Sequence, residues 1–306
     1  MSVADATLLI NLSAGDATYG YLTAKGLIEA HRASVKEVIL VVDTIKAQHA
    51  TFYDHAKRYA EPQYSDKVKA ITEAANQLKN EGLADRVIEI KENDPAIKKL
   101  AKYYFKNRLT ATHDFRGAPI AAYGIGMAAC NTQYVVRYDG DIIVHQTPGN
   151  DWIIKGIEHL KTDKTLIAVS PNPAPPVAGY SLKITHTDIY WFSTRCLLFD
   201  KDLLTQQRPL LDYKYLPEFT LRKLMKRTYP PAFETVITRR LQGKKLINRY
   251  LTNEEAWYLH PEDKGELFLN LLPQIIAKAK SGQYPADQGG KEILQLAAWK
   301  DFLDGE

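Results

Sequence analysis

The sequence predicts an α/β fold in which a mostly parallel central sheet has helices on both faces. Short apolar runs that end in small or polar residues are typical of buried parallel strands, and they alternate with segments of helical spacing. Strands that alternate with helices imply a parallel sheet wrapped on both faces. A chain of 306 residues can also bury a large core, as one domain or as two closely packed halves.

The first half of the chain contains four such strands. Three are expected over residues 7–13, 37–44 and 86–93, and the fourth begins at Tyr134 and ends at Asp139. The helices between them are expected over residues 21–33, about 46 to 82, 95–109 and 118–130. The third of these helices has a proline at its start, where a helix tolerates it.

The second half of the chain is less regular. We expect a strand that runs into a proline-rich loop over residues 166–180, a single aromatic strand over 188–200, and amphipathic helices from about residue 264. No repeat, low-complexity segment or flexible linker interrupts the sequence. We therefore expect one compact domain with two functional halves, residues 1–145 and 146–306.

Composition and charge favour a cytoplasmic protein that does not bind nucleic acid. The net charge of +4 is small, and base-reading modules are missing. Cys130 and Cys196 lie in apolar surroundings, as buried thiols of a reducing compartment do. The first residues lack the basic region of a secretory signal, and the longest weakly polar stretch, residues 119–130, is well short of the roughly 20 residues of a membrane helix. Peripheral contact of a basic face with a membrane stays open as an alternative.

Polar side chains follow several of the predicted strands. Asn11, Ser13, Asp43 and Asp139 would all lie at the carboxyl-terminal edge of the sheet. In open α/β sheets, ligands bind in the crevice beyond this edge. These residues are therefore candidates for ligand contacts.

The sequence Asp139-Gly140-Asp141 places two carboxylates one residue apart on a turn. Carboxylate oxygens suit Mg²⁺ or Mn²⁺, and Mg²⁺ keeps positions for water and substrate phosphates. Glycine allows a tight backbone path between the two acids. A cation held here would neutralise a diphosphate leaving group as a Lewis acid. The alternative is a solvated turn, because Asp-Gly is a common turn dipeptide.

Residues 116–144, RGAPIAAYGIGMAACNTQYVVRYDGDIIV, resemble the central segment of the GT-A glycosyltransferases, especially glycosyltransferase family 2. In that family a small-residue helix leads into a strand that ends in an Asp-x-Asp motif. The resemblance extends to residues 8–13, 37–44, 192–200 and 230–250, and so covers most of residues 5 to 260. Asp43 stands alone where many members have two acids, and Glu234-Thr235 replaces the usual Glu-Asp or Asp-Asp. The resemblance implies a GT-A-like, Rossmann-like sheet.

The resemblance also implies roles for particular side chains. Asp139 and Asp141 would face a nucleotide-sugar diphosphate through Mn²⁺ or Mg²⁺, and His260 would complete the metal shell. Asp43 would contact the base or ribose, and Arg116 would reach a phosphate. The alternatives are an acid that caps the next helix for Asp43, a solvated side chain for Arg116, and a structural histidine for His260.

A transfer that inverts the sugar needs a base to deprotonate the acceptor hydroxyl. Glu234 is the candidate, because it follows Pro230-Pro231 at the expected start of a helix, and Asp188 is the reserve candidate. Positive charges nearby would favour an ionised Glu234; the residues expected to supply them are Arg239, Arg240, Lys244 and Lys245. The alternative for Glu234 is an acid in the first turn of a helix that favours the macrodipole.

The sequence therefore predicts a metal-dependent, inverting glycosyltransferase of the hexosyltransferase type. Residues 1–145 would bind the nucleoside diphosphate sugar, and residues 146–306 the acceptor, a carbohydrate or lipid-linked hydroxyl. A sugar-phosphate nucleotidyltransferase is disfavoured because residues 11–20 contain no Lys or Arg, and a non-catalytic nucleotide-sugar-binding relative because the Asp pair is present. Residues 122–129 match a dinucleotide-binding pattern, but that pattern belongs directly after the first strand.

Overall fold

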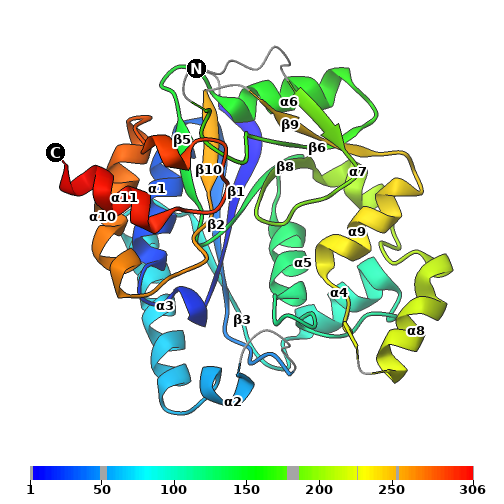
Figure 1. Cartoon of the computed structure of the whole chain (residues 1–306). Helices are drawn as coiled ribbons and strands as arrows, with labels where there is room; N and C mark the ends of the chain where they lie inside the picture. The colour runs from blue at the N-terminus through cyan, green and yellow to red at the C-terminus, as the bar shows by residue number, and fades with distance from the viewer. Residues whose placement is uncertain (1–2, 49–53, 178–185, 226, 253–254, 306) are drawn as a thin grey trace.

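The computed structural model describes residues 3–48, 54–177, 186–225, 227–252 and 255–305. An eight-stranded sheet crosses the molecule, in the order β3-β2-β1-β4-β8-β6-β9-β7 (Figure 1). The strands are β1 Ala4–Ser13, β2 Val35–Asp43, β3 Arg86–Ile90, β4 Tyr134–Asp139, β6 Leu166–Ser170, β7 His186–Ile189, β8 Cys196–Asp200 and β9 Ile247–Leu251. The expected α/β class is confirmed.

Most neighbouring strands of this sheet run parallel. β1 pairs in parallel with β2 and β4, β2 with β3, and β6 with β9. β8 is antiparallel to both β4 and β6, and β7 is antiparallel to β9. The four strands predicted in the first half of the chain therefore form one continuous parallel block, which fixes the shared carboxyl-terminal edge expected from the sequence.

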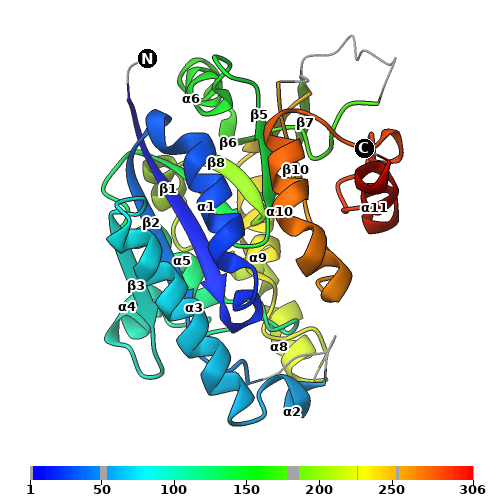
Figure 2. The same cartoon turned by 90° about the vertical axis from the view of Figure 1, so that its left-hand side faces the viewer.

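Helices cover both faces of the sheet, as Figures 1 and 2 show. α1 Gly20–His31, α3 Gln63–Asn80 and α10 Glu266–Lys280 lie on one side, and α4 Pro95–Phe105, α5 Ile120–Ala129 and α9 Phe233–Gln242 on the other. Successive residues of β1 point to opposite faces. Leu8 and Ile10 accordingly pack into the core beneath α1 and α3, whereas Leu9 packs into the core beneath α4, α5 and α9.

The remaining elements are short or lie at the periphery. They are α2 His55–Arg58, α6 Trp152–Thr162, α7 Lys201–Gln206, α8 Leu216–Leu224 and α11 Leu296–Asp304, with 3₁₀ turns at Ala14–Asp16, Arg32–Ser34, Tyr213–Tyr215 and Ala286–Gln288. Cys130 and Cys196 are buried free thiols, as expected. Within the described residues, every helix is too short or too polar to span a bilayer.

Two predicted elements differ from the structure. Residues 188–200 form no single strand: β7 and β8 take separate places in the sheet, and Tyr190 and Trp191 between them are about half exposed. The prediction of one strand was wrong because aromatic side chains are typical of strands, and the residues between β7 and β8 are aromatic. The helix expected from about 46 to 82 is shorter, since α3 begins directly after Pro62, which has no N–H to donate to a preceding turn. Part of that range, residues 49–53, lies outside the described residues.

A second, two-stranded sheet joins the middle of the chain to its late part. β5 Ile143–Gln146 pairs antiparallel with β10 Ala256–Leu259, and Ile143 lies opposite Leu259. An antiparallel register carries the residue after Leu259 toward the residues before Ile143. His260 is thereby placed beside Asp141, more than a hundred residues earlier in the sequence.

The buried side chain of His31 makes the stability of this fold dependent on pH. Its Nε2 lies 2.8 Å from the hydroxyl oxygen of Tyr138, and its ring stacks on the Tyr138 ring. Burial lowers the pKa of His31 from 6.5 to about 4. In the unfolded chain His31 binds a proton below about pH 6.5, whereas in the folded chain it does so only below about pH 4. The folded state therefore loses stability as the pH falls from about 6.5 to about 4.

We expect His31→Gln to remove this dependence, since an amide group can donate or accept the hydrogen bond with Tyr138 but does not titrate. Between pH 7 and pH 5 the wild-type protein should lose about 2 kcal/mol of unfolding free energy more than the variant does. Urea denaturation at several pH values measures this difference. Parallel pH profiles for the two proteins would show that His31 is protonated equally in the folded and unfolded states.

Candidate active site

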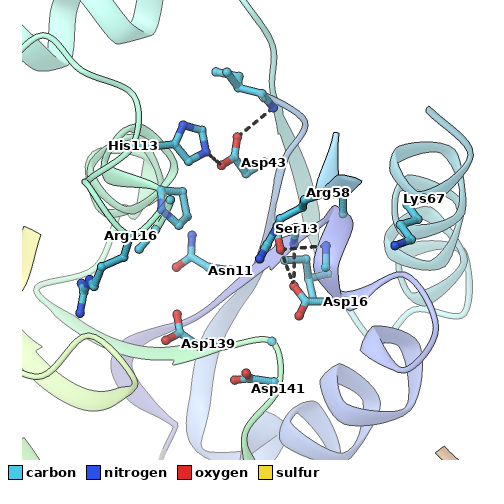
Figure 3. Close-up of a pocket in the computed structure, with 18 of the residues that line it drawn as sticks. Asn11, Ser13, Asp16, Asp43, Arg58, Lys67, His113, Arg116, Asp139 and Asp141 are labelled. Atoms are coloured by element: carbon cyan, nitrogen blue, oxygen red, sulfur yellow. Dashed lines mark hydrogen bonds and ion pairs between the residues drawn. The ribbon is translucent and has the colours of Figure 1, made fainter. Parts of the chain in front are cut away.

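A pocket of about 480 Å³ lies where β1, β2 and β4 end. The register of the sheet aligns its polar residues, because Ser13 lies opposite Asp43 and Asn11 opposite Asp139. Figure 3 shows these side chains around one space. Six of the residues selected from the sequence line it: Asn11, Ser13, Asp43, Arg116, Asp139 and Asp141.

Gly140 sets the position of the two carboxylates beside it. A Cβ atom at this residue would lie 2.5 Å from Cδ2 of Leu12 and 2.9 Å from the backbone oxygen of Asn11. Only glycine lets the turn after β4 pack this closely against β1. The backbone N–H of Asp139 donates to the oxygen of Arg195, and Thr23 Oγ1 donates to the oxygen of Gly140. The turn is therefore held from both sides.

Asp139 is paired with a cation from its own strand. Nη2 of Arg137 donates to Oδ1 of Asp139 at 2.6 Å, and Nε of Arg137 donates to Oδ1 of Asn11 at 3.0 Å. The guanidinium also stacks on the ring of Tyr123, 3.9 Å from its centroid. Burial raises the pKa of Asp139, and Arg137 opposes this shift. Nη1 of Arg137 and Nδ2 of Asn11 are buried donors with no hydrogen-bond partner among the described residues.

Asp141 contacts two residues from the late part of the chain. Nζ of Lys264 donates to Oδ2 of Asp141, and Nε2 of His260 lies 3.4 Å from the same oxygen. Burial acts to raise the pKa of Asp141, but His260 and Lys264 outweigh it and hold this pKa below its usual range. Oδ1 of Asp141 is buried and has no partner among the described residues.

A third carboxylate, Asp16, was not selected from the sequence. The hydroxyl of Tyr19 donates to its Oδ1 at 2.7 Å, and the backbone N–H and the hydroxyl of Ser13 donate to its Oδ2 at 2.7 and 3.0 Å. Burial and the negative charge of Asp141 raise the pKa of Asp16. The sequence does contain a local pattern that could have identified Asp16, because Ser13 and Asp16 have the spacing of a capping box.

Asp43 faces the pocket together with a histidine that sequence reasoning missed. Nε2 of His113 lies 2.8 Å from Oδ2 of Asp43, and both side chains are buried. The backbone N–H of Ile45 donates to the other oxygen at 3.1 Å. Asp43 is thus a residue of the pocket wall and does not cap a helix, because the next described helix, α2, begins at His55 and is capped by Asp54. No local pattern signals His113, since it comes from the loop before α5.

Arg116 links the pocket to Glu234. Its Nη2 lies 2.6 Å from Oε1 of Glu234 and 2.7 Å from Oδ2 of Asp114, a buried residue that also accepts backbone hydrogen bonds from Arg116 and Ala118. Burial acts to lower the pKa of Arg116, but the two carboxylates raise it. Glu234 lies in the first turn of α9, as predicted, and its Oε2 is buried without a partner among the described residues.

Of the four basic residues expected around Glu234, the two arginines pair with other acids, and Lys244 and Lys245 lie beyond the end of α9. Arg239 pairs with Glu218 at 2.6 Å, and Arg240 lies 3.8 Å from Asp212. Side chains of one helix that are five or six residues apart point in different directions, so proximity in sequence did not bring these cations to Glu234. The cation that the structure places there is Arg116.

Three further cations line the pocket and were missed from the sequence. Arg58 comes from α2, Lys67 from α3 and Lys264 from the loop before α10 (Figure 3 labels the first two). They surround a space that already contains four acids, and a pocket with both signs of charge suits a ligand with phosphates and hydroxyl groups. Each lies in a segment where an exposed Lys or Arg is ordinary, so no local pattern distinguishes it.

The structure brings His260 to the Asp pair and leaves Asp188 elsewhere. Asp188 lies on β7, the last strand of the sheet, where it is exposed and forms an ion pair with Nε of Arg249 at 2.7 Å. It is not among the residues that line the pocket. Of the two candidate bases, Glu234 alone is connected to the pocket through a described contact.

No family model matches the sequence, and no curated protein matches it. Among solved structures, the chain is similar to S. aureus TarS 1–349 in complex with UDP-GlcNAc, with a TM-score of 0.45 and 11% identity over 85% of this chain and 59% of that chain. It is also similar to a second crystal structure of S. aureus TarS, with a TM-score of 0.42 and 11% identity over 82% of this chain and 36% of that one. The chain thus spans less than two thirds of either. At these TM-scores the similarity alone carries no functional conclusion.

Proposed function

We propose that the protein is a GT-A-type glycosyltransferase that moves a sugar, of hexose type, from a nucleoside diphosphate sugar to a hydroxyl acceptor. The observation that carries the proposal is the pocket at the ends of β1, β2 and β4, where Asp139 and Asp141 face Arg58, Lys67, Arg116 and Lys264. Phosphates require cations, whereas a sugar, ribose or base presents donors to carboxylates. A nucleotide sugar combines both requirements in one molecule.

The distribution of the pocket residues along the chain supports the same proposal. The pocket is lined by residues between Asn11 and Asp141, with Lys264 as the addition from the second half. We propose that residues 1–145 bind the donor, with Asp43 near the base or ribose. Glu234, from the second half, lies behind Arg116, so the acceptor would enter from the side of α9. A carbohydrate or a lipid-linked sugar would supply the acceptor hydroxyl.

The Asp pair and His260 supply only part of the ligand set that Mg²⁺ or Mn²⁺ needs. Asp141 has one buried oxygen without a partner, and His260 lies beside it. The described residues contain no group of three His, Cys, Asp or Glu that could hold an ion by themselves. Mg²⁺ binds through one or two carboxylates together with substrate phosphates. We therefore propose that Asp139, Asp141 and His260 hold the ion only together with the donor; bound there, it would offset the charge of the leaving diphosphate.

The residues of the chain suggest how transfer with inversion would proceed. The acceptor oxygen attacks the anomeric carbon as the bond from that carbon to the diphosphate oxygen breaks, and the hydroxyl proton passes to a base. We assign the base to Glu234, because Arg116 fixes its Oε1 and leaves Oε2 unpaired. Arg58, Lys67 and Lys264 would stabilise the charge that develops on the departing diphosphate.

The donor class is tested by thermal stability in the presence of UDP, GDP, dTDP or CMP, with and without Mn²⁺. A ligand that binds the folded state at a hundred times its Kd adds about 2.7 kcal/mol of stability. We expect one nucleotide to stabilise the wild-type protein in a Mn²⁺-dependent way, and Asp141→Ala to abolish that shift. Asp301→Ala, an exposed acid on α11, serves as the control. If no nucleotide shifts the wild-type protein, the proposed function is wrong.

Lys264→Met should affect metal and nucleotide in opposite directions. The ammonium of Lys264 donates a hydrogen bond to Oδ2 of Asp141, so a metal ion that binds this oxygen has to displace the ammonium. A hydrogen bond to a charged group contributes about 1.5–3 kcal/mol, so in the presence of saturating nucleoside diphosphate we expect Mn²⁺ to bind about tenfold more tightly to the variant. In the absence of metal we expect the nucleoside diphosphate to bind about tenfold more weakly. Calorimetric titration measures both affinities, with Lys291→Met as the control. An unchanged Mn²⁺ affinity would show that the ion does not bind Asp141.

A further inference from the structure

A second cavity, of about 770 Å³, opens between α4 and α5 and shares no residue with the pocket described above. Figure 1 shows these two helices on the side of the sheet opposite α1 and α10. Arg208 and Pro209, in the segment after α7, also line the cavity. Its lining consists of Ala96, Lys99, Leu100, Lys102, Tyr103, Tyr104, Lys106, Ile125, Ala128, Arg208 and Pro209.

The floor of this cavity is apolar. Leu100 and Tyr104 on α4 and Ile125 on α5 are all less than 10% exposed. Ala128 and Pro209 lie nearer the opening. A hydrocarbon chain that enters such a cavity is removed from water, which favours its binding.

The rim carries positive charge without compensation. Lys99 and Lys102 are three residues apart on α4 and so lie on one face of it, and Lys106 follows directly after the end of the helix. The guanidinium of Arg208 stacks on the ring of Tyr103, 3.7 Å from its centroid. No Asp or Glu lines the cavity, and none of these four cations forms a salt bridge with another described residue. Several cations that line one cavity favour binding of an anion.

An apolar floor beneath a cationic rim matches one type of ligand, an acyl chain that ends in an acidic headgroup. Tyr103 is half exposed between the lysines, which places a phenol at the boundary between the apolar and charged parts, as at membrane interfaces. Lysines extend apolar stems along such a cavity while their ammonium groups reach an anion. A soluble phosphate would use the rim and leave the apolar floor without a function.

We propose that this cavity is a binding site for an anionic phospholipid, through which the protein docks on a membrane surface. One acyl chain would enter between α4 and α5, and the headgroup phosphate would lie among Lys99, Lys102 and Lys106. The inference does not depend on the donor pocket, since the two sites share no residue, and it is tested without nucleotide.

The test is sedimentation of the full chain with vesicles of phosphatidylcholine, with and without phosphatidylglycerol. We expect binding only when phosphatidylglycerol is present. Each basic residue at an anionic surface contributes about a fivefold factor, so the triple variant Lys99→Gln, Lys102→Gln, Lys106→Gln should bind about 100-fold more weakly. The matched control, Lys161→Gln, Lys164→Gln, Lys300→Gln, changes the net charge equally at exposed residues elsewhere and should bind within about fivefold of the wild type.

A second variant tests the apolar part of the site at constant charge. Ala128 is exposed at the opening, so Ala128→Trp should fill it without a change in the core and weaken binding about tenfold. Three results would overturn the proposal: equal loss in both triple variants, wild-type binding by Ala128→Trp, or release from the vesicles by millimolar glycerol phosphate. The first would indicate a diffuse basic surface, and the other two a site for a soluble anion.

Discussion

Replacing Glu234 with glutamine is expected to lower the turnover number about 10²- to 10⁴-fold, the usual contribution of a general base. Glutamine keeps an oxygen that accepts the hydrogen bond from Arg116, so the loop and α9 should retain their positions. It has no carboxylate to take the acceptor proton. The Kd of the nucleoside diphosphate should therefore stay within about twofold, because Glu234 is not among the residues that line the donor pocket. Rapid quench of product formation and a calorimetric titration separate these two quantities.

Asp188→Asn provides the matched control for this experiment. Asp188 is the other candidate base, but it lies on the outer strand β7 in an ion pair with Arg249. Turnover should remain within about twofold of the wild type in this variant. If Asp188→Asn loses activity while Glu234→Gln keeps it, the assignment of the base is reversed and the acceptor binds at the β7 edge of the sheet.

The parallel part of the fold could be predicted because its signals are local. β1, β2 and β4 are apolar runs, and each ends in the polar residue that the structure places at the pocket: Ser13, Asp43 and Asp139. A strand that is buried on both faces has a nearly continuous apolar sequence, so such a run is readily recognised as a strand. The second half offered weaker signals, because the aromatic residues between β7 and β8 fit a strand equally well.

The partners of the predicted residues could not be found in the same way. Lys264 reaches Asp141 because β10 pairs with β5, and His113 reaches Asp43 because the loop before α5 folds back over the sheet. Such contacts depend on the tertiary structure, which no spacing in the sequence encodes. Asp16 is different, since Ser13 and Asp16 carry the spacing of a capping box and a local pattern could have identified it.

Arg137→Met is expected to destabilise the fold by about 1–3 kcal/mol, because it removes a charged hydrogen bond from Asp139, whose side chain is 24% exposed at the pocket. Arg137 is 2% exposed and connects Asp139 and Asn11 on neighbouring strands. Methionine fills much of the same volume and can still pack on Tyr123, so the loss should come from the uncompensated carboxylate and not from a void. Urea denaturation at pH 7 measures the change.

The double variant Arg137→Met, Asp139→Asn distinguishes charge from packing. If the carboxylate of Asp139 is what Arg137 compensates, the second substitution should restore about 1 kcal/mol of the lost stability, because a neutral amide costs less than a charge to hold in a partly buried place. Arg32→Met is the control: its ion pair with Asp85 is 39% exposed on both sides and should contribute at most about 1 kcal/mol. A double variant no more stable than Arg137→Met would mean that Arg137 acts through its contacts with Asn11 and Tyr123. Asp139 would then owe its position in the pocket to the turn at Gly140 alone.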